Sequence, residues 1–292
     1  MDFGRLIVAM ATPFKPDLAI DLERAKQLAR RLVDEGVESF VVSGTTGESP
    51  TLSRQEKIDL IRAVKEVVRV PVIANVGTND TRASIANAKD AEEAGADGLL
   101  LVVPYYNKPD QGMLYDHFAA IARSVKLPAM LYNVPGRTVA SVKPETVVRL
   151  SRDVPNIKAI KEASGDLDAL TIILNEAAPG FVCYTGEDSL TLPSLAVGAY
   201  GVVSVTGHVA APMMREMMAA YVKGDVAKAA LLHGRLRDIN KALFLQPNPV
   251  PVKAALRLVG FDIGSLRPPL KDASDEVVEA LRKALKGLGL LK

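Results

Sequence analysis

Short apolar runs alternate with longer amphipathic segments over the first two thirds of the chain. The short runs are rich in Val, Ile and Leu, which predicts buried strands, and the longer segments carry apolar residues at helical spacing. We predict strands at 6–12, 39–43, 72–76, 98–103, 129–133, within 157–165, at 182–185 and at 202–205, and helices at 21–36, 53–70, 81–94, 111–125, 144–151, 166–178 and 190–197.

The run at 98–103 is apolar throughout, which fits a parallel strand that is covered on both faces. Eight successive strand–helix units predict an α/β fold, namely a closed (β/α)8 TIM barrel with its helices outside. An open doubly wound sheet is the alternative, but no Gly-x-Gly-x-x-Gly turn supports it.

The alternation of strands and helices ends after the eighth predicted strand. Only helical periodicity remains over 212–244, 252–258 and 275–285, and the proline-rich segment 246–251 is predicted to be a stiff connector outside regular structure. We therefore predict a catalytic barrel at residues 1–224 and a C-terminal helical region at 225–292.

Composition narrows the class of protein. Of the 292 residues, 48% are hydrophobic and 24% are charged, and the net charge of +2 gives no reason to expect nucleic acid or an anionic membrane as a partner. Cys183 is the only cysteine, which excludes an internal disulfide and favours a reducing compartment. Because we find neither a signal-peptide pattern nor an apolar run of roughly 18 residues, we expect a cytoplasmic protein.

The sixth predicted strand contains a lysine in a mostly apolar setting, Lys161. Removing an amine from water disfavours its charged form, so Lys161 is a candidate nucleophile for Schiff-base chemistry with a carbonyl substrate. The alternative is a lysine on the barrel surface, with its stem buried and its amine in water.

Further polar groups follow other predicted strands, where barrel enzymes place their active sites. Glycines and hydroxyl groups in 44–49 could bind an anion, although an ordinary turn between a strand and a helix fits these residues as well. Tyr105, Tyr106 and Tyr132 follow or end the fourth and fifth strands, and Arg137 could bind a carboxylate through two parallel hydrogen bonds.

Four segments together resemble a known family. They are Gly44-Thr-Thr-Gly-Glu48, Tyr105-Tyr-Asn-Lys-Pro109, Tyr132-Asn-Val-Pro-Gly-Arg-Thr138 and Ile160-Lys-Glu-Ala-Ser164. In order and spacing they are similar to the motifs of dihydrodipicolinate synthases, lyases of diaminopimelate and lysine biosynthesis among the pyruvate-dependent class I aldolases. The resemblance covers essentially the whole chain.

The resemblance implies a reaction without a cofactor, in which Lys161 forms an imine with pyruvate and the derived enamine adds to L-aspartate 4-semialdehyde. It implies that Tyr132 is the general acid and base and that Thr45 links it to Tyr106. In the family this last tyrosine reaches into a neighbouring subunit, and a homotetramer built as a dimer of dimers is usual.

The resemblance also implies the substrate-binding residues. Thr46, with Thr45, would hold the pyruvate carboxylate, and Arg137 would hold the carboxylate of aspartate semialdehyde. Val203 matches a position that shapes the pyruvate pocket, and we add Gly186 to the substrate-binding residues.

Other functions remain open. N-acetylneuraminate lyases and 2-keto-3-deoxygluconate aldolases look similar around the lysine and tyrosine, but usually lack the arginine that matches Arg137. A non-catalytic organic-acid-binding barrel would lack the nucleophile. A phosphate-binding isomerase barrel would use the loops after the last two strands, but no Gly-Gly pair is present there. Metal catalysis is disfavoured because His117, His208 and His233 do not cluster in the predicted pattern, so we predict no metal site.

One departure from the family concerns regulation. Lysine-inhibited members tend to carry histidine and glutamate in a regulatory cleft, whereas the positions that match here are Arg54, Lys57 and Ala83. Two cationic side chains without a carboxylate do not favour an ammonium group. We therefore predict weak or absent inhibition by lysine.

Overall fold

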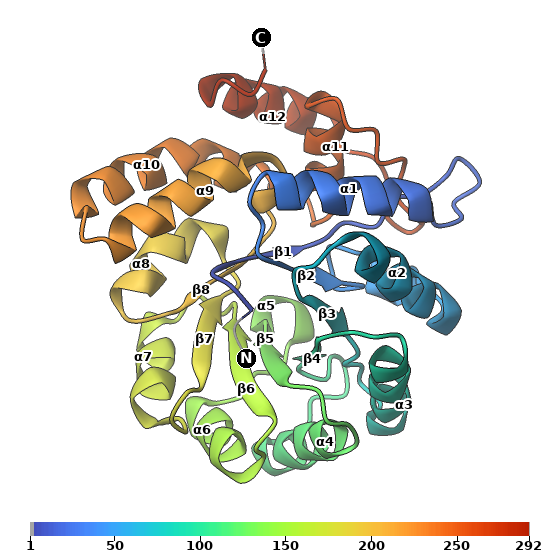
Figure 1. Cartoon of the computed structure of the whole chain (residues 1–292), viewed down its shortest axis with the longest axis vertical. Coiled ribbons are helices and arrows are strands. Elements are labelled where there is room, and N and C mark those ends of the chain that lie inside the picture. The colour runs from blue at the N-terminus through green and yellow to red at the C-terminus, as the bar shows by residue number, and fades with distance from the viewer. Residues whose placement is uncertain (1–2, 292) are drawn as a thin grey trace.

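The strands form where runs of apolar, often β-branched residues lie between turn residues. In the computed structural model, which describes residues 3–291, eight parallel strands close into a barrel in which β1 pairs with both β2 and β8 (Figure 1). They are β1 (Leu6–Ala9), β2 (Ser39–Val42), β3 (Val72–Asn75), β4 (Gly98–Val102), β5 (Ala129–Asn133), β6 (Ile157–Glu162), β7 (Val182–Thr185) and β8 (Gly201–Ser204). The predicted (β/α)8 barrel is confirmed.

Helices surround the barrel, and most start at a polar cap. The second helix has the predicted capping box, in which the Ser53 side chain and Glu56 bond each other's backbone. The helices are α1 (Leu22–Asp34), α2 (Arg54–Val67), α3 (Thr81–Glu93), α4 (Gln111–Arg123), α5 (Pro135–Thr138), α6 (Pro144–Asp153), α7 (Leu167–Glu176), α8 (Thr191–Ala196), α9 (Gly207–Val222), α10 (Val226–Ala242), α11 (Val250–Leu258) and α12 (Asp275–Gly287), with short 3-10 turns η1 (Ser49–Thr51) and η2 (Asp188–Leu190). Within residues 3–291, no helix has the length and apolar character needed to cross a membrane.

The apolar core has two parts because strand side chains alternate between two faces. One cluster fills the barrel interior and includes Ile7, Met130, Ala159 and Val203. The larger cluster lies between the strands and the surrounding helices. Lys161 lies two residues after Ala159 on β6 and therefore faces the barrel interior.

Five predicted strands were too long at their carboxyl ends, β1 by three residues and β2, β3, β4 and β8 by one each. β1 stops at Ala9 instead of residue 12, since the backbone N–H of Ala11 donates to Nε2 of His208 and not to a neighbouring strand. β8 ends at Ser204 because the backbone N–H of Val205 donates to the Asp188 carboxylate. In both cases a side chain takes the hydrogen bond that would have extended the ladder.

The C-terminal part is helical, as expected, with two differences. α9 begins at Gly207, five residues before the predicted start, and accommodates Pro212 beside a non-helical Ala210. The predicted connector 246–251 is wrong at its end, since α11 starts at Val250 and tolerates a proline in its first turn. Figure 1 shows α10, α11 and α12 on one side of the barrel, and the predicted boundary after residue 224 falls in the turn between α9 and α10.

Candidate active site

The Lys161 side chain faces a cavity of about 410 Å³ at the carboxyl ends of the strands. The lysine is 7% exposed, and its Nζ lies 4.2 Å from the centre of the Tyr132 ring. The two residues are register partners on β6 and β5, so the sheet itself places the amine over the ring. We call this space, which Thr45, Tyr132, Arg137 and Gly186 also line, the Lys161 cavity.

Gly186 leaves room for the lysine. A Cβ at this position would lie 2.8 Å from Cε of Lys161 and 2.6 Å from Cβ of Ala163, both closer than carbon atoms pack. The missing side chain therefore keeps the amine extended into the cavity.

The loop after β2 contributes two hydroxyl groups. Thr45 and Thr46 both line the Lys161 cavity, and Thr46 is 3% exposed. Nδ2 of Asn248 donates to Oγ1 of Thr46 at 2.8 Å, and the backbone carbonyl of Asn248 accepts from the Arg137 guanidinium at 3.5 Å. The C-terminal region thus reaches the site, which the sequence analysis did not predict; the only signal was an asparagine held between two prolines.

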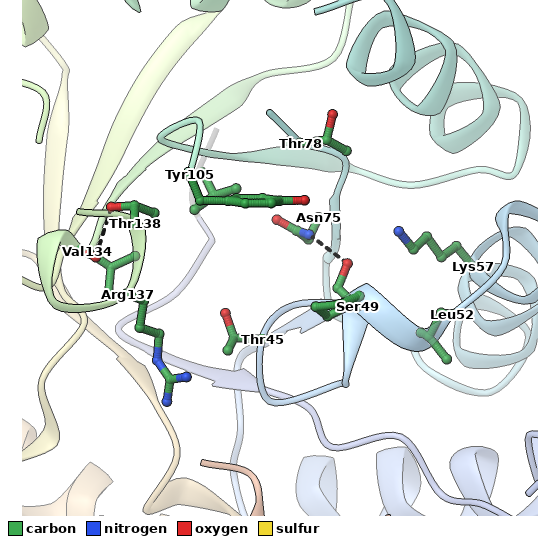
Figure 2. A pocket seen from close by; sticks show the side chains of 13 residues that line it. Thr45, Ser49, Leu52, Lys57, Asn75, Thr78, Tyr105, Val134, Arg137 and Thr138 are labelled. Atoms are coloured by element: carbon green, nitrogen blue, oxygen red, sulfur yellow. Dashed lines mark hydrogen bonds between the residues drawn. The ribbon is translucent and has the colours of Figure 1, made fainter. Parts of the chain in front are cut away.

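Arg137 lies on α5, a one-turn helix that the sequence analysis missed. It lines the Lys161 cavity and also a neighbouring cavity of about 360 Å³. Figure 2 shows this second space, which we call the Tyr105 cavity, with the Tyr105 ring along one side and Lys57 at the far end. Asn75 lies between them, and its Nδ2 donates to Oγ of Ser49 at 3.3 Å.

Two predicted site residues lie elsewhere. Tyr106 is 87% exposed, has a left-handed backbone with φ of 78°, and is outside the described lining of both cavities. Val203 is buried inside the barrel, and Val205, directly after the end of β8, lines the Lys161 cavity instead. Within one chain, the structure therefore brings together Lys161, Tyr132, Thr45, Thr46, Arg137 and Gly186.

Carboxylates near the amine were also missed from sequence. Glu187 follows β7 and lines the Lys161 cavity, and burial raises the pKa of its carboxyl group. Glu162 neighbours the lysine in sequence but faces away from it, where it accepts hydrogen bonds from Nδ2 of Asn133 on β5. This contact joins the two strands that carry Lys161 and Tyr132.

The histidines lie apart. Within the described part of the chain, no group of three His, Cys, Asp or Glu side chains could hold a metal ion. His208 is fully buried, with Nε2 accepting from the Ala11 N–H and Nδ1 2.8 Å from the Val205 carbonyl. His117 on α4 contacts Oγ1 of Thr81.

Of the three positions that the lysine prediction depends on, Arg54 and Lys57 lie one turn apart on α2 and line a small pocket together. The guanidinium of Arg54 pairs with the Asp90 carboxylate, and Lys57 lines the Tyr105 cavity, where burial lowers its pKa. Ala83 lies in the first turn of α3.

Comparison with known proteins adds four findings. Residues 2–288 match the sequence profile of the Dihydrodipicolinate synthetase family. The chain is 52% identical over 293 aligned residues to the 4-hydroxy-tetrahydrodipicolinate synthase of Moorella thermoacetica, with 100% of both chains covered. It superposes with a TM-score of 0.96 and 49% identity on dihydrodipicolinate synthase DapA-2 of Bacillus anthracis, with 98% of each chain covered. For the pyruvate-complexed, chloride-inhibited dihydrodipicolinate synthase of Acinetobacter baumannii, the TM-score is 0.95 at 38% identity, covering 99% of this chain and 100% of that one.

Proposed function

The chain belongs to the Dihydrodipicolinate synthetase family, and from this premise we propose that Lys161 is the nucleophile of a 4-hydroxy-tetrahydrodipicolinate synthase reaction. The enzyme is a lyase that condenses pyruvate with L-aspartate 4-semialdehyde in the diaminopimelate route to lysine. The observation that carries the role of Lys161 is its position, buried beside Tyr132 and facing a cavity of about 410 Å³.

The chemistry needs no cofactor. Nζ of Lys161 attacks the ketone carbon of pyruvate, and loss of water gives an imine. Removal of a methyl proton gives an enamine, whose carbon adds to the aldehyde of the second substrate. The product amine then attacks the imine carbon, which closes the ring and releases Lys161. The pyruvate complex of the Acinetobacter baumannii relative supports pyruvate as the first substrate.

Each of these steps moves a proton. Tyr132 is the general acid and base, since its ring lies beside the lysine amine. Thr45 faces the same cavity and would pass protons toward Tyr106 of a neighbouring subunit. The exposure of Tyr106 in the single chain supports this arrangement, because a side chain that is 87% exposed is free to enter another subunit.

The remaining polar groups bind the substrate carboxylates. Thr46 holds pyruvate, with its hydroxyl already oriented by Asn248. Arg137 lies at the junction of the two cavities, where its guanidinium would bind the carboxylate of aspartate semialdehyde. Gly186 leaves space for the imine, and Val203 supports the pocket from the barrel interior.

The proposal includes a homotetramer built from dimers and a cytoplasmic location. The free and buried thiol of Cys183 is compatible with a reducing compartment. Mixed subunits test the dimer. The Lys161→Ala and Tyr106→Phe enzymes should each be inactive or nearly so, and hybrids of the two should regain activity because one site then holds an intact lysine and an intact tyrosine. Absence of recovery in hybrids verified by mass would place Tyr106 in its own subunit's site.

Trapping tests the central claim. Pyruvate and borohydride should leave a reduced pyruvyl adduct on Lys161, detected by digestion and mass spectrometry, and Lys161→Ala should abolish the adduct. An adduct on another lysine, or none, contradicts the mechanism. Coupled assays with aspartate semialdehyde, N-acetylneuraminate and 2-keto-3-deoxygluconate identify the substrate, and excess chelator should leave the rate unchanged.

A further inference from the structure

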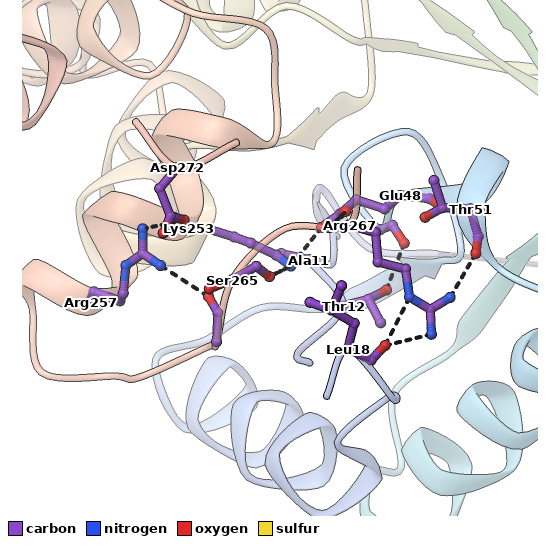
Figure 3. A network of polar contacts seen from close by, with 12 residues as sticks. Ala11, Thr12, Leu18, Glu48, Thr51, Lys253, Arg257, Ser265, Arg267 and Asp272 are labelled. Carbon is purple, nitrogen blue, oxygen red and sulfur yellow. Dashed lines mark hydrogen bonds and ion pairs between the residues drawn. The ribbon is translucent and has the colours of Figure 1, made fainter. Parts of the chain in front are cut away.

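A buried ion pair joins the C-terminal region to the loop after β2. The side chains of Lys253 on α11 and Glu48 are 0% and 1% exposed, and Nζ lies 2.6 Å from Oε1 (Figure 3). Nζ also donates to the backbone carbonyl of Ser265 at 2.9 Å and lies 4.2 Å from the centre of the Phe14 ring. Burial lowers the pKa of Lys253 to about 8, so the amine is charged at neutral pH.

The second oxygen of the carboxylate is held as well. The backbone N–H of Arg267 donates to Oε2 of Glu48 at 2.9 Å. The guanidinium of Arg267 then bonds the backbone carbonyl of Thr51, just after the same loop, and that of Leu18, in the connection between β1 and α1 (Figure 3). Both carboxylate oxygens of Glu48 are therefore fixed by residues of the C-terminal region.

Glu48 is connected directly to the predicted catalytic loop. Its backbone is left-handed, with φ of 59°, a conformation that costs energy in a residue with a side chain. Its N–H donates to the backbone carbonyl of Thr45 at 3.0 Å, and the N–H of Ser49 donates to Gly44 at 3.1 Å. Moving Glu48 would therefore move the turn that carries Thr45 and Thr46.

Stability alone does not account for this pair. Burying two charges is expensive, and apolar replacements of similar volume are often as stable or more stable. Neither residue of the pair is among those that line the Lys161 cavity, whereas Asn248, five residues before Lys253, lines it and bonds Thr46. The C-terminal region thus contacts the turn at two points.

We propose that Glu48 and Lys253 are positioning residues that hold the turn at Thr45 and Thr46 in place for catalysis at Lys161. The inference rests on the proposed function, since it assigns a use to the geometry of that site. It makes the C-terminal helical region a part of the active site and not only a cover for the barrel.

Three variants and one control test the idea. Lys253→Met and Glu48→Gln each break the pair, and the double variant removes both charges. Lys65→Met is the matched control, since Lys65 pairs with Asp97 directly before β4, at the opposite end of the barrel. For these four variants and the unmodified enzyme we would measure steady-state kinetics with pyruvate as the varied substrate, the rate of adduct formation under borohydride, and thermal melting.

We expect the melting temperature of the double variant to be higher than that of either single variant, because no charge is left buried and unpaired. We expect kcat/KM for pyruvate to stay about 10- to 100-fold below that of the unmodified enzyme, since a displacement of about 1 Å can cost up to about 100-fold. The control should keep its kinetic constants even if it melts earlier.

Two results would overturn the inference. One is a folded double variant whose kinetic constants lie within about twofold of those of the unmodified enzyme. The other is an activity that recovers in parallel with the melting temperature. If the single variants do not fold, the double variant alone decides. A failure of the proposed function is distinct, since the unmodified enzyme would then form no adduct on Lys161.

Discussion

Gly186→Ala is the most direct test of how the barrel positions the amine of Lys161. The new Cβ would lie 2.8 Å from Cε of Lys161 and 2.6 Å from Cβ of Ala163. Carbon atoms pack at about 3.5–4.0 Å, so relief of these contacts requires movements on the order of 1 Å. Cβ of Ala163 is fixed to the backbone of the chain just after β6, whereas Cε of Lys161 can rotate away, so the lysine should yield first.

Two effects should follow in different measurements. Displacement of the amine by about 1 Å should lower kcat by about 100-fold. The overpacked site should cost about 1–3 kcal/mol in the free energy of unfolding, because the shift of Lys161 does not relieve the contact with Ala163. We would measure kcat in a coupled assay, adduct formation with pyruvate and borohydride, and unfolding in urea.

Gly234→Ala on α10 is the matched control. A Cβ at Gly234 meets no atom within 4 Å, so the same substitution should raise stability by about 0.5–1 kcal/mol and leave the kinetics unchanged. A Gly186→Ala enzyme with normal kcat and normal adduct formation would refute the view that this glycine keeps space for Lys161.

Three further predictions follow from other contacts. Arg137→Ala should raise KM for aspartate semialdehyde by about 10- to 100-fold, the value of a charged hydrogen bond, while adduct formation with pyruvate stays within about twofold; an unchanged KM would remove Arg137 from substrate binding. Burial lowers the pKa of both His117 and His208 to about 4, so between about pH 6.5 and 4 the unfolded chain binds protons that the folded chain does not. The free energy of unfolding should therefore fall as the pH falls through this window, by up to about 3 kcal/mol per histidine. In urea unfolding, His117→Gln should make the free energy of unfolding depend less on pH. Lysine should inhibit weakly or not at all, because Lys57 offers an amine and no carboxylate to its ammonium group and Arg54 is occupied by Asp90; clear inhibition at physiological lysine in a steady-state assay would contradict this.

The local pattern of apolar and polar residues was sufficient to predict the barrel architecture. Strand β5 has the predicted bounds, and the capping box at Ser53 and Glu56 is formed, because both depend on residues close in sequence. The ends of β1 and β8 were mispredicted because His208 and Asp188, from distant parts of the chain, take the hydrogen bonds that would have extended those strands. Helix α5, which carries Arg137, has one turn and too few residues for a helical period to be visible.

The sequence by itself determined the barrel and the strand that carries Lys161, since both follow from local patterns of apolar and polar residues. Only the tertiary structure decided that Asn248 meets Thr46 across 202 residues and that Lys253 meets Glu48. No periodicity relates residues so far apart, because their contact depends on how α11 packs against the closed barrel. The proposed nucleophile could therefore be found from its strand, and the residues that contact the loop beside it could not.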